Sequence, residues 1–239
     1  MSSKQWLSRQ RLDQYVVRAA REGYRSRALC RRLECHSCLC LPLLTRRPTL
    51  RFGPTGAAYK LQQIHQKTKI LHSGHVALEL GASPGSWTQV LVKHGLRVVG
   101  VDLLPIEPID GATLVQGDFT SPSVQATLQE ALGEGGRCDV LLSDVSPNRS
   151  GNKSLDDAAI SDYCTQSLEL ASRCLKPGGT FVCKLLQGAE LQHTLERAKP
   201  LFKTSGGLMK PAASRPKSRE IYLVAKGFDP EAYSNRLFW

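Results

Sequence analysis

Acidic side chains follow several apolar runs of this chain, and their spacing is typical of a nucleoside site. The run 76–80 leads into a turn that contains Gly81 and Gly85, and a second apolar run ends in Asp102. Glycines at such a turn let the backbone approach a ligand closely, and a carboxylate at the end of the next strand can accept hydrogen bonds from a ribose. These residues predict a cofactor that contains adenosine.

The composition of the turn narrows the choice of cofactor. It reads Gly81-Ala82-Ser83-Pro84-Gly85-Ser86-Trp87, which lacks the third glycine of the dinucleotide fingerprint and the Gly-Lys-Ser/Thr of a P-loop. A cofactor without phosphate groups fits better, and we expect S-adenosylmethionine. Taken alone, the same spacing is compatible with an ordinary strand-to-helix turn.

Two further apolar runs lead to Asp118 and Asp144. The carboxyl ends of parallel strands meet at one sheet edge, where like charges repel each other unless a ligand or a cation compensates. We therefore expect a site at this edge, with Asp118 placed to hold an adenine amino group.

A lysine at the same edge suggests how an acceptor loses its proton. Lys184 ends the apolar run 180–183, and Asp144 is followed by Val-Ser-Pro-Asn with no aromatic residue on which a flipped base could stack. A ribose 2′-hydroxyl is then a better acceptor than a base. Lysine can take its proton when burial and a second cation lower the pKa of its ammonium group. The same sequence pattern would also arise if Lys184 were only a solvent-exposed charge at the end of a strand.

Strands and helices alternate along the chain, as the positioning of these groups requires. This order predicts an α/β protein with a Rossmann-like, doubly wound and mostly parallel sheet, preceded by a basic helical arm. Pro177-Gly178-Gly179 predicts a helix stop followed by a turn. The expected strands are 76–80, 97–102, 113–116, 138–143, 179–185 and 220–225, and the expected helices are 12–27, 58–70, 86–94, 121–132, 155–174 and 189–198.

The distribution of charge points to a polyanionic partner. The net charge is +11, and the first 61 residues contain 13 Lys and Arg against 3 Asp and Glu. A second basic cluster comprises Lys210, Arg215, Lys217 and Arg219. Two remote basic segments are most simply explained as walls of one RNA groove. A solvated basic helix face or adhesion to an anionic membrane would share this composition.

The remaining composition excludes some classes of protein. No apolar run is long enough to span a bilayer, so no membrane partner is expected. Nothing resembles a secretory signal, and the eight cysteines are expected to be reduced thiols. Four of them are expected in or beside the core: Cys138, Cys164, Cys174 and Cys183.

Longer motifs resemble the FtsJ/RrmJ family of RNA 2′-O-methyltransferases, over residues 4–227. The matching segments are 24–28 with 58–61, 80–87, 101–105, 116–119, 143–148, 182–184 and 218–222. The resemblance implies a class I fold dependent on S-adenosylmethionine. It is strongest to the members that methylate a uridine ribose in the A-loop of large-subunit ribosomal RNA. A monomer acting on an assembled or nearly assembled ribosomal particle is expected.

The resemblance also implies roles for single residues. Four of them fall on the family's Lys-Asp-Lys-Glu tetrad, namely Lys60, Asp144, Lys184 and Glu220. Within it Lys184 would be the proton acceptor, Lys60 and Glu220 would orient the ribose, and Asp144 would be shared with the methionine end of the cofactor. Cofactor-binding positions are matched by Gly85, Trp87, Asp102 and Asp118, in addition to Gly81. No metal is expected.

An insertion interrupts the first motif. Segments that are contiguous in the family are separated here by residues 29–57, which contain Cys30, Cys35, His36, Cys38 and Cys40. A lone Cys-x-x-Cys is unlike a structural zinc site, which pairs two such knuckles. The chain then divides into a basic arm (1–28), the insertion (29–57), a methyltransferase domain (58–227) and a tail (228–239).

Several functional alternatives share these motifs. A transfer-RNA or cap ribose methyltransferase would carry the same tetrad. If the insertion displaces Lys60, a catalytically impaired protein that binds RNA or assists ribosome assembly becomes the alternative. Because the family similarity begins near Lys4, little room is left for a presequence. A cytoplasmic location is therefore expected, with the mitochondrion as the alternative.

Overall fold

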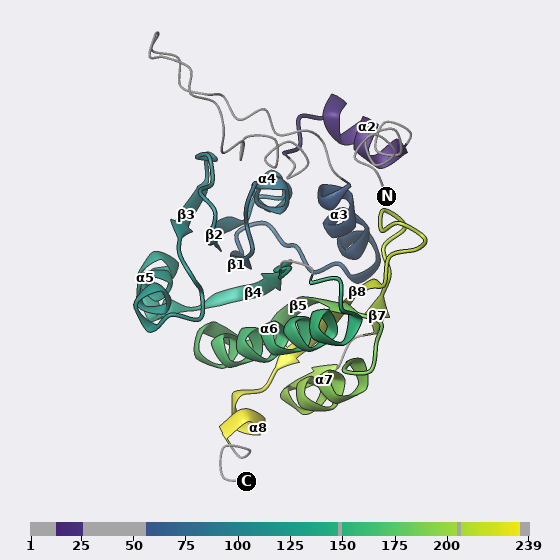
Figure 1. Cartoon of the computed structure of the whole chain (residues 1–239). Helices are drawn as coiled ribbons and strands as arrows, with labels where there is room; N and C mark the ends of the chain where they lie inside the picture. Colours follow the sequence, from purple (N-terminus) through teal and green to yellow (C-terminus); the bar gives the residue numbers. More distant parts are fainter. Residues whose placement is uncertain (1–12, 26–55, 148–149, 205–206, 235–239) are drawn as a thin grey trace, which may run out of the picture.

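The structure is a computed structural model that describes residues 13–25, 56–147, 150–204 and 207–234. An eight-stranded sheet forms its centre, in the order β3-β2-β1-β4-β5-β8-β6, with β7 also paired to β8 (Figure 1). The strands are β1 Val76–Leu80, β2 Arg97–Asp102, β3 Ala112–Gln116, β4 Cys138–Ser143, β5 Leu175–Leu186, β6 Phe202–Thr204, β7 Leu208–Met209 and β8 Glu220–Phe228. The helices are α2 Gln14–Arg21, α3 Ala57–Thr68, α4 Ser86–Lys93, α5 Pro122–Leu132, α6 Lys153–Cys174, α7 Leu191–Ala198 and α8 Pro230–Ser234.

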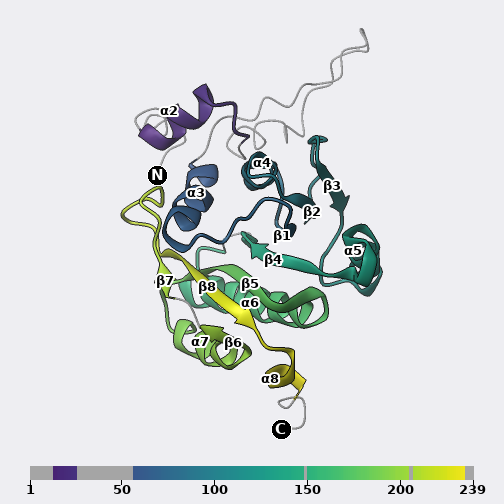
Figure 2. The ribbon, with the colours of Figure 1, turned by 180° about the vertical axis from the view of Figure 1, so that it is seen from behind.

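The strands β3, β2, β1, β4 and β5 are parallel, as predicted. The antiparallel strand β8 is the next strand beyond β5 in the sheet. Figure 2, which views the molecule from behind, shows β8 running alongside β5. Leu80 is level with Val101 on one side and with Ser143 on the other, and Ser143 is level with Cys183. The residues that follow these positions, among them Asp102, Asp144 and Lys184, therefore meet at one edge of the sheet.

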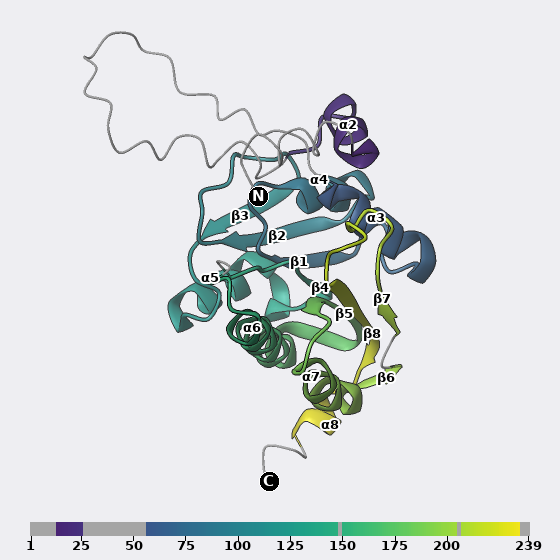
Figure 3. The ribbon, with the colours of Figure 1, turned by 45° about the vertical axis from the view of Figure 1, so that its right-hand side comes forward.

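Helices cover both faces of the sheet (Figures 1 and 3), which confirms the predicted doubly wound α/β architecture. Alternate residues of a strand point to opposite faces. In β4, Leu141 packs into the cluster that includes residues of α5, α6 and α7, while Val140 and Leu142 pack into the cluster that includes residues of α3 and α4. Two-sided burial explains why these strands read as continuous apolar runs.

The structure differs from the expected elements in their lengths. In place of the helix expected at 12–27, the described part contains only the shorter α2. The chain leaves the helical conformation at Gly23, which has a φ of +74°. Residues 26–27 lie outside the described part. Helix α6 ends at Cys174, before Pro177, and β5 begins at once with Leu175. Leu175 pairs with Cys138, but the next pair is Val140 with Thr180, so residues 176–179 interrupt the ladder as a bulge.

Among the α-helices and strands of the described part, three short ones were not predicted. They are β6, β7 and α8, of three, two and five residues. Strand β6 is fixed by the pairing of Phe202 with Phe228, both buried, which is a tertiary contact without a local signature. Among the described elements, no helix combines the length and the apolar character that crossing a bilayer requires.

Candidate active site

A buried lysine and a carboxylate meet at the carboxyl edge of the sheet. Lys184, near the end of β5, is 6% exposed. Its Nζ donates a hydrogen bond to the backbone oxygen of Asp144 at 2.7 Å and lies 3.2 Å from Asp144 Oδ1. Because Asp144 directly follows β4, the neighbouring strands β4 and β5 fix both groups. The predicted proximity of these two residues is therefore present in the structure.

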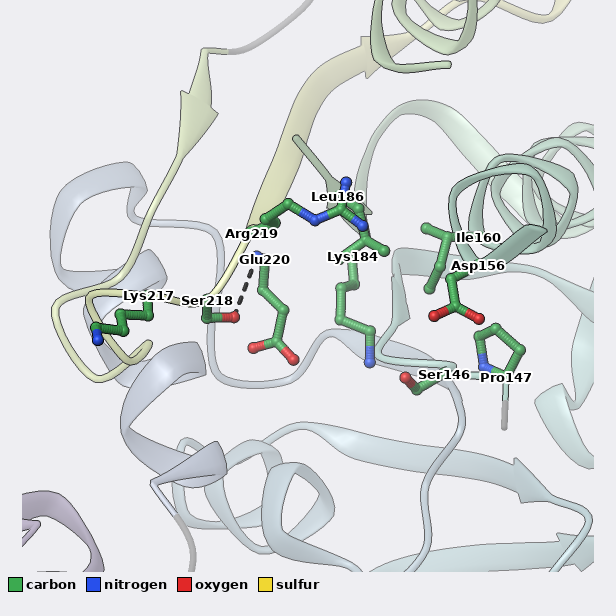
Figure 4. A pocket seen from close by; sticks show the side chains of 10 residues that line it. All are labelled: Ser146, Pro147, Asp156, Ile160, Lys184, Leu186, Lys217, Ser218, Arg219 and Glu220. Atoms are coloured by element: carbon green, nitrogen blue, oxygen red, sulfur yellow. Dashed lines mark hydrogen bonds between the residues drawn. The ribbon is translucent and has the colours of Figure 1, made fainter. Parts of the chain in front are cut away.

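A second ion pair joins α3 to β8. Lys60 Nζ lies 2.7 Å from Glu220 Oε2, and the two side chains are 16% and 19% exposed. Lys60 is the fourth residue of α3, a helix that begins at Ala57, and Glu220 is the first residue of β8. Figure 4 shows the Glu220 and Lys184 side chains extending in the same direction beside each other. The residues of the tetrad thus form two ion pairs at one site.

A tyrosine that the sequence analysis gave no role completes the cluster. Tyr222 Oη donates a hydrogen bond of 2.9 Å to Asp144 Oδ1, and its ring packs against Trp87 with 5.7 Å between centroids. Burial, together with the charge of Asp144, raises the pKa of Tyr222 well above its usual value, so the hydroxyl stays a donor. The signal was available, because Tyr222 lies two residues beyond Glu220 on the same face of a strand.

Both carboxylates of the cluster are held in the ionised form. Burial alone would raise the pKa of Asp144, but the charges of Lys184 and Lys60 and the hydroxyl of Tyr222 hold it below its usual value. Burial likewise opposes ionisation of Glu220, and Lys60, by charge and by hydrogen bond, keeps the pKa of that carboxyl low. Two cations and two anions therefore compensate one another within the site.

Two positions of the glycine turn are restricted by their backbone conformation and by close contacts with the rest of the protein. Gly81 and Gly85 have φ values of +80° and +107°, which side chains rarely adopt. A Cβ on Gly81 would lie 3.0 Å from the backbone nitrogen of Val145, and one on Gly85 would lie 2.6 Å from Cδ1 of Ile109. Glycine is therefore required at both positions.

The two other predicted cofactor carboxylates differ in their surroundings. Asp102, at the end of β2, accepts hydrogen bonds of 2.9 Å from the backbone amides of Ser83 and Leu104, so its orientation is fixed. Asp118 is exposed and accepts from the backbone amide and hydroxyl of Thr120. Acceptors beside a glycine turn suit the hydroxyls, the amino group and the positive sulfonium of S-adenosylmethionine better than they suit phosphates. The residues present fit this cofactor.

The side chain of Trp87, another predicted cofactor residue, is buried. Its side chain is 2% exposed, packs in the core and donates a hydrogen bond of 2.8 Å from Nε1 to the backbone oxygen of Ala57. Only the backbone of Trp87, in the first turn of α4, is available to a ligand at the glycine turn. The side chain instead ties α4 to the start of α3.

A buried glutamate beneath the turn was missed by the sequence analysis. Glu79 in β1 is 1% exposed, and its Oε2 accepts a hydrogen bond of 2.6 Å from the hydroxyl of Thr88. Burial raises the pKa of Glu79 to about 8, and the charges of Asp144 and Asp102 act in the same direction. Glu79 is therefore mostly neutral at pH 7. A carboxylate inside an apolar strand is rare and was the available signal.

A pocket of about 120 Å³ opens beside Lys184 and Glu220. Figure 4 shows Lys217 and Ser218 on one side of these two residues, and Ser146, Pro147, Asp156 and Ile160 on the other. Leu186 and Arg219 also line it. Among the described residues, no group of three or more His, Cys, Asp or Glu is arranged to hold a metal ion. The cysteines of the insertion lie outside the described part.

Comparisons with known proteins identify the family of this chain. The sequence pattern described as FtsJ-like methyltransferase matches residues 55–228. The ribosomal RNA large subunit methyltransferase E of Granulibacter bethesdensis is 38% identical to this chain, and the match covers 96% of this chain and 86% of that protein. The protein of the same name from Acidiphilium cryptum is 40% identical, and the match covers 97% of this chain and 89% of that protein. A crystal structure of a Plasmodium falciparum protein assigned as a ribosomal RNA methyltransferase is 30% identical, covers 72% of this chain and 96% of that one, and has a TM-score of 0.64.

Proposed function

The chain belongs to the FtsJ-like methyltransferase family, and on that premise we propose that it methylates the ribose 2′-hydroxyl of a uridine in the A-loop of large-subunit ribosomal RNA. S-adenosylmethionine is the methyl donor. The observation that carries the proposal is the Lys184–Asp144 contact, flanked by the Lys60–Glu220 pair, at the mouth of a pocket. A lysine held at a strand end beside an open pocket is placed to act on an acceptor hydroxyl.

The side chains of the cluster would divide the work as follows. When bound, the cofactor supplies an electrophilic methyl group on a sulfonium. Once its ammonium group has lost a proton to water, Lys184 would accept a hydrogen bond from the 2′-hydroxyl. It would take the hydroxyl proton as the methyl group leaves the sulfur for the 2′-oxygen, and would then release that proton to water. Asp144, fixed by Tyr222, keeps the Lys184 amine aimed at the acceptor. Lys60 and Glu220 orient the ribose, so positioning contributes most of the rate.

The pocket offers different surroundings to the two ends of a nucleotide. If the 2′-oxygen lies at Lys184, the neighbouring phosphate and the base must extend from the ribose in different directions. The exposed Lys217 suits a phosphate, while Pro147 and Ile160 suit the face of a base. Asp156 on the same side would repel a phosphate and can accept a hydrogen bond from a base N–H.

Only part of the second basic cluster is available to RNA. Lys210 Nζ donates to the backbone oxygens of Pro216 and Ser218, and Arg219 is paired with Asp157. These two residues shape the segment before β8, while Arg215 and Lys217 are exposed. We assign the phosphate contacts of this segment to Arg215 and Lys217.

The alternatives differ from this proposal in the substrate or in activity. A transfer-RNA or cap ribose methyltransferase would use the same cluster, but the names of the curated relatives specify the large ribosomal subunit. A catalytically impaired assembly protein would require a displaced Lys60, whereas Lys60 contacts Glu220. We therefore favour an active, monomeric, cytoplasmic enzyme that acts on a nearly assembled particle.

Substrate choice is tested by offering labelled S-adenosylmethionine with three acceptors: large ribosomal subunits that lack the modification, protein-free large-subunit RNA, and transfer RNA. The proposal predicts transfer to the subunits above that to free RNA, and none to transfer RNA. Preferential transfer to transfer RNA would favour the first alternative. Binding to subunits without any transfer would favour the assembly role.

A further inference from the structure

Arg25, at the end of the described part of the basic arm, connects three segments. Its Nη1 and Nη2 donate to the backbone oxygens of Glu107 and Pro108 at 2.7 and 3.0 Å. Its backbone amide donates to Oε1 of Gln89 in α4 at 3.0 Å, and the Gln89 amide group reaches back to the backbone oxygen of Gly23 at 3.3 Å. The arm is thus bound to α4 and to the segment that follows β2.

The segment that Arg25 holds adjoins the cofactor residues. It runs from Leu103 to Gly111, directly after Asp102, and Ile109 within it packs over Gly85: a Cβ on Gly85 would meet Ile109 Cδ1 at 2.6 Å. The same Cβ would lie 3.4 Å from Cδ and Nη1 of Arg25. The arginine, the 103–111 segment and the glycine turn are therefore in mutual contact.

We propose that Arg25 is a positioning residue for the cofactor site, which holds the 103–111 segment against the glycine turn and thereby sets the affinity for S-adenosylmethionine. The inference rests on the proposed cofactor site. It reassigns a cation of the basic arm, because a guanidinium whose two terminal nitrogens both donate to backbone carbonyls is poorly placed to bind a phosphate as well. A planar fork suits two adjacent carbonyl oxygens, whereas a lysine ammonium does not reproduce its geometry.

The test compares Arg25→Ala and Arg25→Lys with Arg21→Ala, an exposed arginine of the same arm. Three quantities are measured: the Kd for S-adenosylhomocysteine by calorimetry, the exchange of amide hydrogens in residues 103–111 without ligand, and the affinity for large-subunit RNA. Both Arg25 variants should weaken cofactor binding about tenfold or more, as the loss of hydrogen bonds from a charged group predicts. They should also speed exchange in 103–111, with no greater loss of RNA affinity than Arg21→Ala.

Unchanged cofactor affinity together with unchanged exchange would overturn the inference, as would a loss confined to RNA binding. Near-normal affinity in Arg25→Lys would also contradict it, since charge alone would then suffice. If the unmodified chain itself bound no cofactor, the proposed function would fail as well. The exchange measurement would still decide whether Arg25 holds the segment, so the two failures are distinguishable.

Discussion

Lys60 and Glu220 are 160 positions apart in the chain, yet their side chains form an ion pair of 2.7 Å. The pair depends on α3, which begins at Ala57, at the very end of the insertion. The backbone oxygen of Ala57 accepts a hydrogen bond from Trp87, and Leu61 and Ile64 of α3 are fully buried. The helix is therefore held by the core, and the position of Lys60 follows from that packing.

Removal of residues 29–57 should accordingly leave the enzyme folded and active. Ala28 would then precede Ala58 and take the place of Ala57 beside Trp87, and Arg25 would keep its contacts with the domain. We expect comparable methyl transfer by the full chain and the shortened chain under identical conditions. Activity in the shortened chain alone would mean that the insertion disables the enzyme.

Replacement of Asp102 should weaken cofactor binding. The carboxylate at the end of β2 is oriented by the amides of Ser83 and Leu104, and its proposed partner is a ribose. Losing hydrogen bonds to a charged group costs about 1.5–3 kcal/mol, which corresponds to roughly a 10- to 150-fold weaker affinity. Calorimetry with S-adenosylhomocysteine should show this for Asp102→Ala, with Asp110→Ala, exposed in the same loop, as the control. Equal affinities would refute the ribose assignment.

Glu79 should make the free energy of unfolding fall as pH rises. Its pKa is about 8 in the folded chain, against an ordinary value of 4.5 when unfolded. Between these values the folded state holds a proton that the unfolded state has released. Stability then declines by at most about 1.4 kcal/mol per pH unit, and levels off above the folded pKa.

Denaturant unfolding at several pH values tests this directly. The stability of Glu79→Gln relative to the unmodified chain should rise between about pH 4.5 and 8, because the amide carries no titrating proton. Glu130→Gln, an exposed position on α5, serves as the reference. A difference between Glu79→Gln and the unmodified chain that does not vary with pH would contradict the assignment.

The ion pair between Arg219 and Asp157, here called the clamp, lies beside the pocket and should be broken by a single methyl group added at Gly188. Arg219 donates to both carboxylate oxygens of Asp157, at 2.7 and 2.9 Å, and joins the start of β8 to the first turns of α6. A Cβ on Gly188 would clash with Oδ2 of Asp157. Gly188→Ala should therefore break the pair, lower the free energy of unfolding by about 1–3 kcal/mol and reduce methyl transfer through Glu220.

Double substitution isolates this effect. With Asp157→Ala already present, Gly188→Ala should cost little further, because the clashing carboxylate is gone. Gly207→Ala, at a site where a Cβ would meet nothing within 4 Å, is the matched control. Additive losses of stability in the double variant would show that Gly188 is constrained by something other than the clamp.

The residues at the carboxyl edge of the sheet could be predicted from the sequence because each strand has a local signal. Apolar runs locate β1, β2 and β4, and the rule that parallel strands end at one edge brings Asp102, Asp144 and Lys184 together. The positions of Lys60 and Glu220 were implied only by family resemblance, since nothing in either segment indicates a partner so distant in the chain.

Other parts of the site depend on contacts that have no local pattern. The hydrogen bond from Tyr222 to Asp144 and the bonds from Arg25 to two backbone oxygens require the assembled fold. Charge composition predicted RNA contacts for the whole basic arm, but it could not distinguish an arginine bonded internally from one that faces solvent. Trp87 matched a cofactor motif, yet its side chain belongs to the core.

The most direct test of the account uses labelled S-adenosylmethionine and large ribosomal subunits, followed by digestion to nucleosides, with the unmodified chain and Lys184→Ala compared at equal cofactor occupancy. The account predicts a 2′-O-methylated uridine with the unmodified chain, and transfer reduced about 10²- to 10⁴-fold in the variant, the range for loss of a general base. Label on a base atom, or equal transfer by Lys184→Ala, would contradict it.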